Sequence, residues 1–556
     1  MLPAETEVAS KEPSIRLGPT EPSTPTVVGA ESGGLIPTPL EAGRGEFDSV
    51  EMRPTPWWQY AIVSGLFVLA GIAAVGLVIP SGNELEYLVR LRHFADPNYL
   101  AGDWTFGSGF DEHFVWVRVF APLMNLLGMA VLAPVARIVI WFSISLLFLQ
   151  IGRRLGARPL YTFVALIAWL GLNQSMGVGA TKIVTEFQAS VVAYPILLLA
   201  MVLTLRGKVA WSMFLAGLAF SFHPGVGLWG SGALAVTLLL MSDTRSQALR
   251  SIWLLVIGSL PGAVPQVLSL LRSSVSADDA AFVAMVRIPH HVDPFSFGER
   301  GPLILSAMLA FNLLLHWRLR DEYPHRLLGI FQAVSLLPVV LGIVARLTDQ
   351  TWFLMLAPFR VLPVFTTVAF LINLAAIVNR RRWDLLWPRI SVTWIDRFRS
   401  LAGLGAVAGV LILWNPFVAI ANDAIGNYTF GQTEASDFEL ALAWIAAETP
   451  VDAQILGPPD RRDLFVRTDR PQYVSWDAIP YDRVPEWRRR LESVMPAGFF
   501  DDYPRDRSWA DDFALLPQEQ LVGLEPAVDF VVTTATYDLD AVFTSGQWTV
   551  YEVAQP

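Results

Sequence analysis

The chain has 556 residues, of which 53% are hydrophobic and 16% are charged, and its formal net charge is −10. Soluble proteins are about 25% charged, so this composition argues against a soluble enzyme and indicates a protein with many membrane spans. No basic patch is interleaved with aromatic residues, which argues against nucleic-acid binding. The absence of cysteine excludes disulfides, thiolate metal sites and a cysteine nucleophile.

Residues 1–56 are predicted to form a disordered segment on the cytoplasmic side of the membrane. They are rich in Pro, Ser, Thr, Glu and Gly and contain few large apolar residues. Such a segment cannot bury enough surface to offset its chain entropy. It has no short apolar core near its start, so it does not resemble a cleaved signal peptide.

Apolar runs between residues 57 and 421 predict about eleven transmembrane helices, since a span needs about 20 apolar residues. The run 114–128 is instead expected to lie along the membrane surface. With that choice the N-terminus and every basic loop fall on one side, which the positive-inside rule makes the cytoplasm. The predicted spans are 57–79, 133–151, 159–173, 187–205, 209–222, 225–241, 251–271, 302–317, 327–345, 361–378 and 401–421.

The C-terminal part, residues 430–556, is predicted to form a small α/β domain outside the membrane. Amphipathic helices are expected at 437–450 and 483–495. The strands expected are AQILGPP, VDFVVTT and QWTVYEV, the last two rich in β-branched and aromatic residues. This part has no glycine-rich phosphate loop and no serine–histidine pair, so a packing or recognition role is favoured over chemistry.

The large first outer loop, 80–132, opens with the acidic stretch NELEYLVRLRHF. A short helix is expected here, because leucines repeat every three residues along it. Glu86 and Arg90 share the opposite face, so a solvated ion pair explains Glu86 without a catalytic role. Glu84 lies at the very start of the helix, where the span meets the loop, and this explanation suits it less well.

The same loop continues as YLAGDWTFGSGFDEHF, which supplies Asp103, Asp111, Glu112 and His113. Several acids and a histidine in one loop suit a divalent metal such as Mg²⁺ or Mn²⁺, bound through oxygen ligands. The alternative is a solvated loop, and no residue is singled out as a metal ligand. Asp103 is the strongest candidate, because its neighbours are a flexible glycine and a tryptophan suited to an interface or a sugar face.

Charged residues at the outer ends of later spans form a second group of candidates. Glu186 stands at the mouth of a span, where an acid also suits the N-terminal end of a helix. His223 lies on a tight Pro–Gly turn between two spans; ionisable groups near the membrane are functional candidates, although a single histidine is more often structural. Because guanidinium groups form paired bonds to phosphate, an anionic head group is the expected contact of Arg287, His290, His291, Arg346 and Arg360.

In order and pattern, residues 57–230 resemble the GT-C superfamily of membrane glycosyltransferases, which includes the bacterial protein O-mannosyltransferases and aminoarabinose transferases. The resemblance rests on a first span, the acidic helix, a surface helix that closes in LLG, and a span that ends in GRRLGARP. These families open the first outer loop with an acidic pair followed by a tyrosine. Here the pair is Asn83–Glu84, followed by Tyr87, and TEF…YPILLLAMVLTLRG resembles the later span that starts beside an outer acid.

The resemblance implies an inverting hexosyl or pentosyl transferase in a bacterial cytoplasmic (inner) membrane, with its C-terminal domain in the periplasm or outside the cell. A sugar would pass from a polyprenyl-phosphate donor to a glycan, lipid or protein acceptor, with or without a divalent metal. Glu84 or Asp103 would take the acceptor's proton as the sugar carbon gains positive charge. The resemblance places Tyr87 and Glu186 beside the substrate, and the phosphate would meet cations that include Lys182.

Two other classes of function stay open. A polymerase, ligase or flippase of lipid-linked glycans also has many spans, and it often places its key arginines and histidine in one large later loop. A non-enzymatic transporter or scaffold would bury charges in the middle of its spans. Most ionisable residues of this chain fall at span ends, which counts against an ion-coupled transporter.

Overall fold

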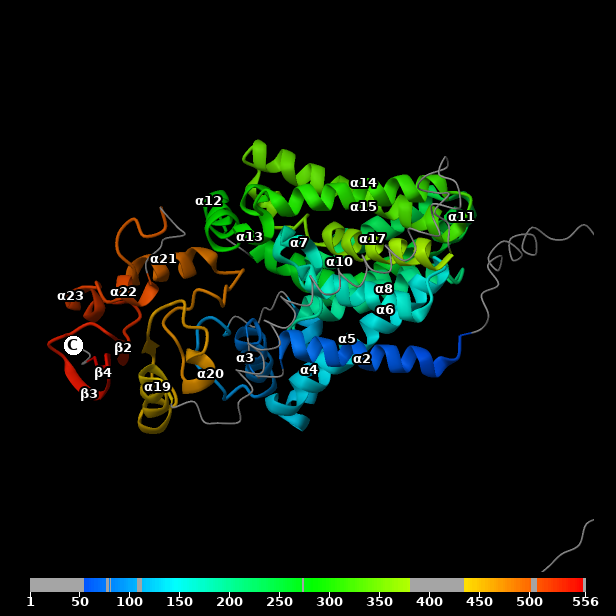
Figure 1. Cartoon of the computed structure of the whole chain (residues 1–556). Helices are drawn as coiled ribbons and strands as arrows, with labels where there is room; N and C mark the ends of the chain where they lie inside the picture. The colour runs from blue at the N-terminus through cyan, green and yellow to red at the C-terminus, as the bar shows by residue number, and fades with distance from the viewer. Residues whose placement is uncertain are drawn as a thin grey trace, which may run out of the picture. The chain divides into compact units, whose positions relative to one another are not determined.

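The computed structural model describes residues 55–76, 80, 82–107, 113–272, 275–380, 435–501 and 508–553. The protein is mainly helical, with a small mixed α/β region in its C-terminal part (Figure 1). The predicted span 401–421, the acids Asp111 and Glu112, and nearly all of the N-terminal segment 1–56 lie outside the described residues.

In the part of the chain that the structure describes, five helices are long and apolar enough to cross a membrane. At about 1.5 Å per residue, even a 19-residue helix covers roughly the thickness of the hydrocarbon core. Large apolar side chains such as Leu270 and Leu271 are exposed on these helices, as expected where lipid replaces water. These five helices indicate a multi-pass membrane protein. The helices are α2 (Trp57–Val75), α5 (Met129–Arg154), α11 (Ser242–Arg272), α15 (Tyr323–Leu347) and α17 (Val361–Arg380).

Shorter helices complete the helical part. With the long helices they coincide with every predicted apolar run except 401–421, and the predicted surface run forms α4. Gly217 of α9 and Gly258 of α11 allow a close approach, because a Cβ on either glycine would meet backbone of the other helix. The shorter helices are α4 (Phe114–Leu127), α6 (Pro159–Gly171), α8 (Ala189–Thr204), α9 (Val209–Phe222), α10 (Pro224–Leu240) and α14 (Arg300–Arg318).

Short helical turns shape the loops between the long elements. They lie after α6, between α11 and α14, and before α17, and several of them carry candidate site residues. They are α7 (Asn173–Met176), η1 (Val178–Ala180), α12 (Ala277–Phe282), η2 (Val283–Arg287), α13 (Pro289–Val292), η3 (Pro294–Ser296) and α16 (Thr351–Leu354).

The acidic stretch after α2 forms helix α3 (Glu84–Ala95), as predicted. Its Glu86–Arg90 ion pair is confirmed, with Arg90 Nη2 2.9 Å from Glu86 Oε1. The expected solvated face is wrong, because Arg90 is only 6% exposed. Its guanidinium donates to the carbonyl of Ile479, 3.1 Å away, and lies over the ring of Phe106. The C-terminal region therefore covers the charged face of α3.

The C-terminal region contains a four-stranded sheet in the order β1-β2-β4-β3. Strands β1 and β2 are parallel, and the other pairs are antiparallel. Each predicted helix and strand is present; β3 was missed because its exposed residues carry no alternating apolar pattern. The elements are α19 (Asp437–Glu448), β1 (Ile455–Leu456), α20 (Leu464–Thr468), α21 (Val484–Val494), α22 (Trp509–Phe513), α23 (Gln518–Val522), β2 (Phe530–Thr533), β3 (Asp540–Ser545) and β4 (Trp548–Glu552).

This region shares its apolar core with the loop between α11 and α14. Phe282 and Val283 are buried in one cluster with Trp476, Trp487 and residues of the sheet. The indole N–H of Trp104, in the first loop, donates to the Tyr473 carbonyl at 2.7 Å. Burial of large aromatic side chains contributes strongly to such contacts, so the first loop, the later loop and the C-terminal region form one packed unit.

Candidate functional site

Three stacked rings mark the point where several loops meet. They belong to Tyr87 of α3, His113 just before α4, and His223 between α9 and α10. The Tyr87 and His113 ring centres are 5.3 Å apart, and those of His113 and His223 are 5.0 Å apart. The Tyr87 hydroxyl lies 3.0 Å from His113 Nε2. The structure thus brings two predicted substrate contacts, Tyr87 and His223, together through His113.

His223 is held by the turn that starts α10. Pro224 occupies the first position of the helix, and the Val226 N–H donates to His223 Nδ1 at 3.1 Å. A Cβ on Gly225 would lie 3.3 Å from the imidazole Cε1, so glycine lets the ring fold back over the turn. Burial, and then the charges of His113 and Arg360, lower the pKa of His223 well below its ordinary value. The ring is therefore neutral near pH 7.

A neutral imidazole accepts a hydrogen bond at only one nitrogen. In His223, Nδ1 faces the Val226 N–H, and Nε2 lies 3.2 Å from Arg360 Nη1, which is also a donor. Two donors thus compete for one acceptor, whichever tautomer is present. An oxygen anion placed beside Arg360 and Nε2 would accept from both and resolve the conflict.

Arg360 lies in the short connection between α16 and α17. Its carbonyl accepts from the Tyr194 hydroxyl at 2.7 Å, which fixes the backbone. Its Nε is buried without an acceptor, and no carboxylate of the described residues lies within ion-pair distance of its guanidinium. The positive charge of Arg360 is therefore not neutralised by any carboxylate of the described residues. A guanidinium suits phosphate because its planar fork makes paired hydrogen bonds.

His290 and His291 lie side by side on α13, with ring centres 4.2 Å apart. His291 Nδ1 is 3.0 Å from the Gly179 carbonyl, which only accepts, so Nδ1 carries the proton. Burial, and then the charge of Arg360, lower the pKa of His291 well below its ordinary value. Burial, followed by Arg287 and Arg360, lowers the pKa of His290 to about 4. Both rings are therefore neutral near pH 7.

Arg287 and Arg462 share one carboxylate, that of Asp477. Arg287 Nη2 lies 2.5 Å from Asp477 Oδ1, and Arg462 Nε lies 2.6 Å from Oδ2. Arg287 also donates to the Trp476 carbonyl at 2.7 Å and lies over the indole ring. Arg462 Nη1 is 3.4 Å from Asn83 Oδ1 at the start of α3. This bridge joins the later loop, the first loop and the C-terminal region.

The charges of Arg287, Arg360 and Arg462 each lower the pKa of His290, so all three lie within electrostatic reach of its ring, and Asp477 joins Arg287 to Arg462 directly. We call this group the arginine–histidine cluster. Sequence reasoning missed the contribution of Arg462, because its surroundings in the C-terminal region gave no recognisable motif. The cluster consists of His113, His223, Arg287, His290, His291, Arg360 and Arg462.

Glu84 is completely buried and bound by Arg137, which is also completely buried. Arg137 Nε donates to Glu84 Oε1 at 2.7 Å, and Nη2 donates to Oε2. The Phe187 N–H also donates to Oε1, and Arg137 Nη1 donates to the Gly76 carbonyl at 3.0 Å. The pair therefore ties α2, α3 and α5 to the segment before α8. A lone arginine inside an apolar run was the signal that could have revealed it.

Asp103 is only 1% exposed and accepts three backbone hydrogen bonds. Its Oδ1 accepts from the N–H groups of Thr105 and Phe106 at 2.8 and 3.4 Å. Its Oδ2 accepts from the Gln472 N–H at 3.0 Å. Burial raises the pKa of Asp103, and these three amides oppose that effect. The carboxylate joins the first loop to the C-terminal region.

The remaining candidates lie outside the arginine–histidine cluster. Glu186 is half-buried and accepts from the Thr185 hydroxyl; it precedes α8 by three residues rather than starting that helix. Lys182 is exposed. Arg346 forms an ion pair with Asp293, which directly follows α13; Arg346 Nε lies 3.1 Å from Asp293 Oδ1.

Within the described ranges, no group of three or more histidine, aspartate or glutamate side chains is arranged to hold a metal ion. The cluster offers mainly guanidinium and imidazole nitrogens, whereas Mg²⁺ prefers oxygen ligands. Its residues therefore fit an anion better than Mg²⁺ or Mn²⁺. The predicted metal site in the first loop included Asp111 and Glu112, which lie outside the described residues, so it stays a prediction.

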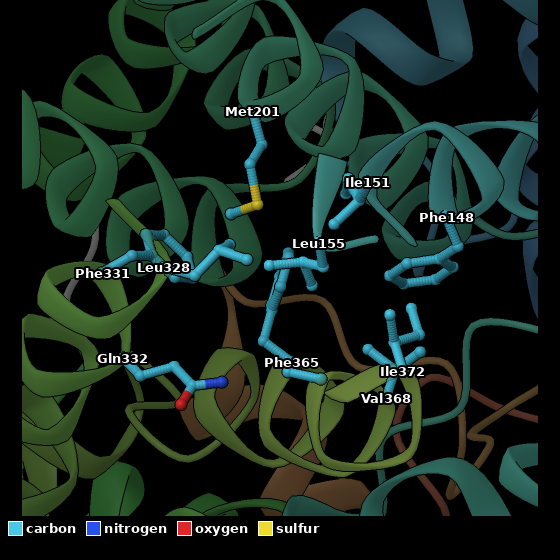
Figure 2. Close-up of a pocket in the computed structure, with 11 residues that line it drawn as sticks. Phe148, Ile151, Leu155, Met201, Leu328, Phe331, Gln332, Phe365, Val368 and Ile372 are labelled. Atoms are coloured by element: carbon cyan, nitrogen blue, oxygen red, sulfur yellow. The ribbon is translucent and has the colours of Figure 1, made fainter. Parts of the chain in front are cut away.

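An apolar hollow lies among the helices, separate from the cluster (Figure 2). It encloses about 330 Å³ of empty space, including open space at its mouth. Side chains of α5, α8, α15 and α17 line it, among them Phe148, Met201, Phe331 and Phe365. Gln332 is the polar member of the lining, and its Oε1 is buried without a hydrogen-bond partner among the described residues. This lining carries no acid–base or phosphate-binding chemistry.

Comparison with known proteins finds a family for one segment of the chain. Residues 436–494 match the model of a domain of unknown function, DUF6798. No curated protein matches the chain. The matched segment runs from the start of α19 to the end of α21 and includes Arg462 and Asp477. The part of the chain that is similar to DUF6798 therefore contributes directly to the arginine–histidine cluster.

Proposed function

We propose that the protein is a membrane-embedded glycosyltransferase that uses a sugar linked to polyprenyl phosphate. In this proposal the arginine–histidine cluster binds the phosphate. The observation that carries the proposal is the Arg360–His223 contact: Arg360 and the Val226 N–H compete for the single acceptor nitrogen of His223, and the Arg360 guanidinium has no carboxylate partner among the described residues. A phosphate oxygen that accepts from Arg360 and from a protonated His223 Nε2 would leave His223 Nδ1 to accept from Val226.

A lipid-linked phosphate fits the position of the cluster along the chain. His223 separates the apolar helices α9 and α10, and Arg360 directly precedes the apolar helix α17. A phosphate held there can keep its polyprenyl tail among apolar helices. When the sugar leaves, the phosphate gains negative charge, and fixed cations stabilise that charge in the transition state.

The proposal gives Glu84 and Asp103 a positioning role. Each carboxylate is buried and already accepts three hydrogen bonds. A base has to reach the acceptor hydroxyl, and these two carboxylates are engaged within the protein. They help to hold the folded first loop, which carries Tyr87 and His113.

The proposed topology and setting follow the sequence pattern. We propose about eleven spans in a GT-C-like arrangement, a bacterial inner membrane, a cytoplasmic N-terminus and a periplasmic C-terminal region. Transfer is then a single displacement with inversion at the sugar carbon. The acceptor is a hydroxyl of a glycan, lipid or protein.

The test combines binding and transfer in nanodiscs. Replacing Arg360 by glutamine removes at least one charge-assisted bond, worth about 1.5–3 kcal/mol, so the affinity for undecaprenyl phosphate should fall at least about 10- to 100-fold. Transfer from a panel of undecaprenyl-phosphate hexoses and pentoses should fall at least as far. Arg300→Gln is the matched control, because Arg300 is exposed at the start of α14. Unchanged affinity and transfer in Arg360→Gln would remove the basis of the proposal.

A second candidate function is a polymerase or ligase of lipid-linked glycans. It is favoured by the contribution of one later loop, which places Arg287, His290 and His291 in the cluster. Such an enzyme would use a sugar linked through diphosphate. Transfer from an undecaprenyl-diphosphate oligosaccharide, without transfer from any monophosphate donor, would select this function.

A further inference from the structure

Asp460 lies in the turn GPPDRRD, 457–463, which follows the carboxyl end of β1. The Arg461 N–H donates to the Pro458 carbonyl at 3.0 Å, and the Trp476 N–H donates to the Pro459 carbonyl at 2.8 Å. These bonds hold the turn against the segment that carries Trp476.

One oxygen of Asp460 lacks a partner. Its Oδ1 is buried and accepts no hydrogen bond from any described residue. The backbone N–H of Asp460 itself is the amide that stabilises the charged carboxylate. Leaving a buried acceptor unsatisfied costs about 1–3 kcal/mol. This cost favours a bound molecule that donates a hydrogen bond to Asp460 Oδ1.

Other carboxylates around the cluster form ion pairs with arginines of the chain. Asp477 is shared by Arg287 and Arg462. Glu86 is paired with Arg90. Asp460 differs from them, because no ion pair to its carboxylate is found among the described residues.

Asp460 also lies within electrostatic reach of the cluster. Burial raises its pKa to about 6; Arg461 and Arg462 lower the pKa, whereas Asp477 raises it. Arg462 lies two residues further along the same turn and shares Asp477 with Arg287, so the turn that carries Asp460 borders the arginine–histidine cluster. A base works best when its pKa is near the working pH.

We propose that Asp460 is the proton acceptor of the transfer reaction, supplied by the segment that matches DUF6798. This inference rests on the proposed glycosyltransferase function. Asp460 Oδ1 takes the proton of the acceptor hydroxyl while the hydroxyl oxygen forms a bond to the sugar C1. The bond between C1 and the phosphate oxygen breaks, and its electron pair leaves with the phosphate. Protonated Asp460 then returns the proton to water.

The test compares Asp460→Asn with Asp463→Asn in full-length protein in nanodiscs. Asp463 belongs to the same turn but pairs with Arg461 and Arg467, so the control removes the same charge nearby. Loss of a general base lowers the rate about 10²- to 10⁴-fold. That loss is expected in Asp460→Asn, with unchanged binding of undecaprenyl phosphate, while Asp463→Asn stays near wild type.

The pH profile adds a readout that a structural role would not change. The wild-type rate should rise through about pH 6, as Asp460 loses its proton, and level off above. The residual rate of Asp460→Asn should lack this rise, and Asp460→Glu should restore part of it. Transfer by Asp460→Asn within tenfold of wild type would overturn this inference and leave the proposed function standing. A wild-type protein that transfers no sugar from any donor would overturn both.

Discussion

The buried Glu84–Arg137 pair gives the sharpest prediction about how the first loop is held. Replacing Arg137 by methionine removes the two hydrogen bonds that it donates to the Glu84 carboxylate and leaves the Gly76 carbonyl without its donor. Both side chains are completely buried, so water cannot replace these bonds. Breaking a buried pair in this way costs about 3–5 kcal/mol.

Unfolding of the purified chain in detergent measures the cost. At about 2–4 °C per kcal/mol for larger domains, the apparent Tm of Arg137→Met should fall by roughly 10 °C. The double variant Glu84→Gln/Arg137→Met should recover part of this loss, because it leaves no buried charge. Arg300→Gln is an exposed control and should stay within about 0.5 kcal/mol of wild type.

The same variants separate a positioning role of Glu84 from a catalytic one. If Glu84 only positions the loop, Glu84→Gln lowers stability, yet the fraction that stays folded transfers sugar within tenfold of the wild-type rate. The reasoning is refuted if Arg137→Met unfolds like wild type. It is also refuted if Glu84→Gln keeps its stability but loses transfer about 10²-fold or more, as removal of a general base does.

Two further predictions test the packing and the orientation of the chain. Asp103→Asn places an amide where three backbone N–H groups converge, which should lower the free energy of unfolding by about 1–3 kcal/mol. The segment at Gln472 should then be cut more readily in limited proteolysis. Unchanged protease resistance would contradict the contact between Asp103 and Gln472. Because the chain has no cysteine, single cysteines report orientation cleanly: in intact cells an impermeant maleimide should label Ala435→Cys, whereas Gln247→Cys should react only after permeabilisation, and the reverse pattern would invert the proposed topology.

Helices of the membrane part were predictable because each needs only a local apolar run. α10 begins where the Pro–Gly turn after His223 predicts. In the C-terminal region, amphipathic periodicity located α19 and α21, and β-branched runs located β2 and β4. β3 carries no such pattern, since most of its residues are exposed or half-buried.

The candidate site was only partly predictable, because its geometry depends on contacts between distant segments. Glu84 and Asp103 were singled out as acids of the first outer loop that could act as a base, and the structure buries both of them. Arg137 was not predicted as the partner of Glu84, because it lies within an apolar run of the sequence. Arg462 and Asp460 stand in a turn without a recognisable motif, and only the fold brings that turn to the loop of His290.

The central claim is that the arginine–histidine cluster binds the phosphate of a polyprenyl lipid. The most direct measurement is a cryo-electron microscopy map of the protein in nanodiscs with undecaprenyl phosphate. We predict phosphate density within hydrogen-bond distance of Arg360 Nη1 and His223 Nε2, the two nitrogens that now lie 3.2 Å apart. Phosphate density beside Lys182 or Arg346, with the Arg360–His223 contact unchanged, would contradict the account.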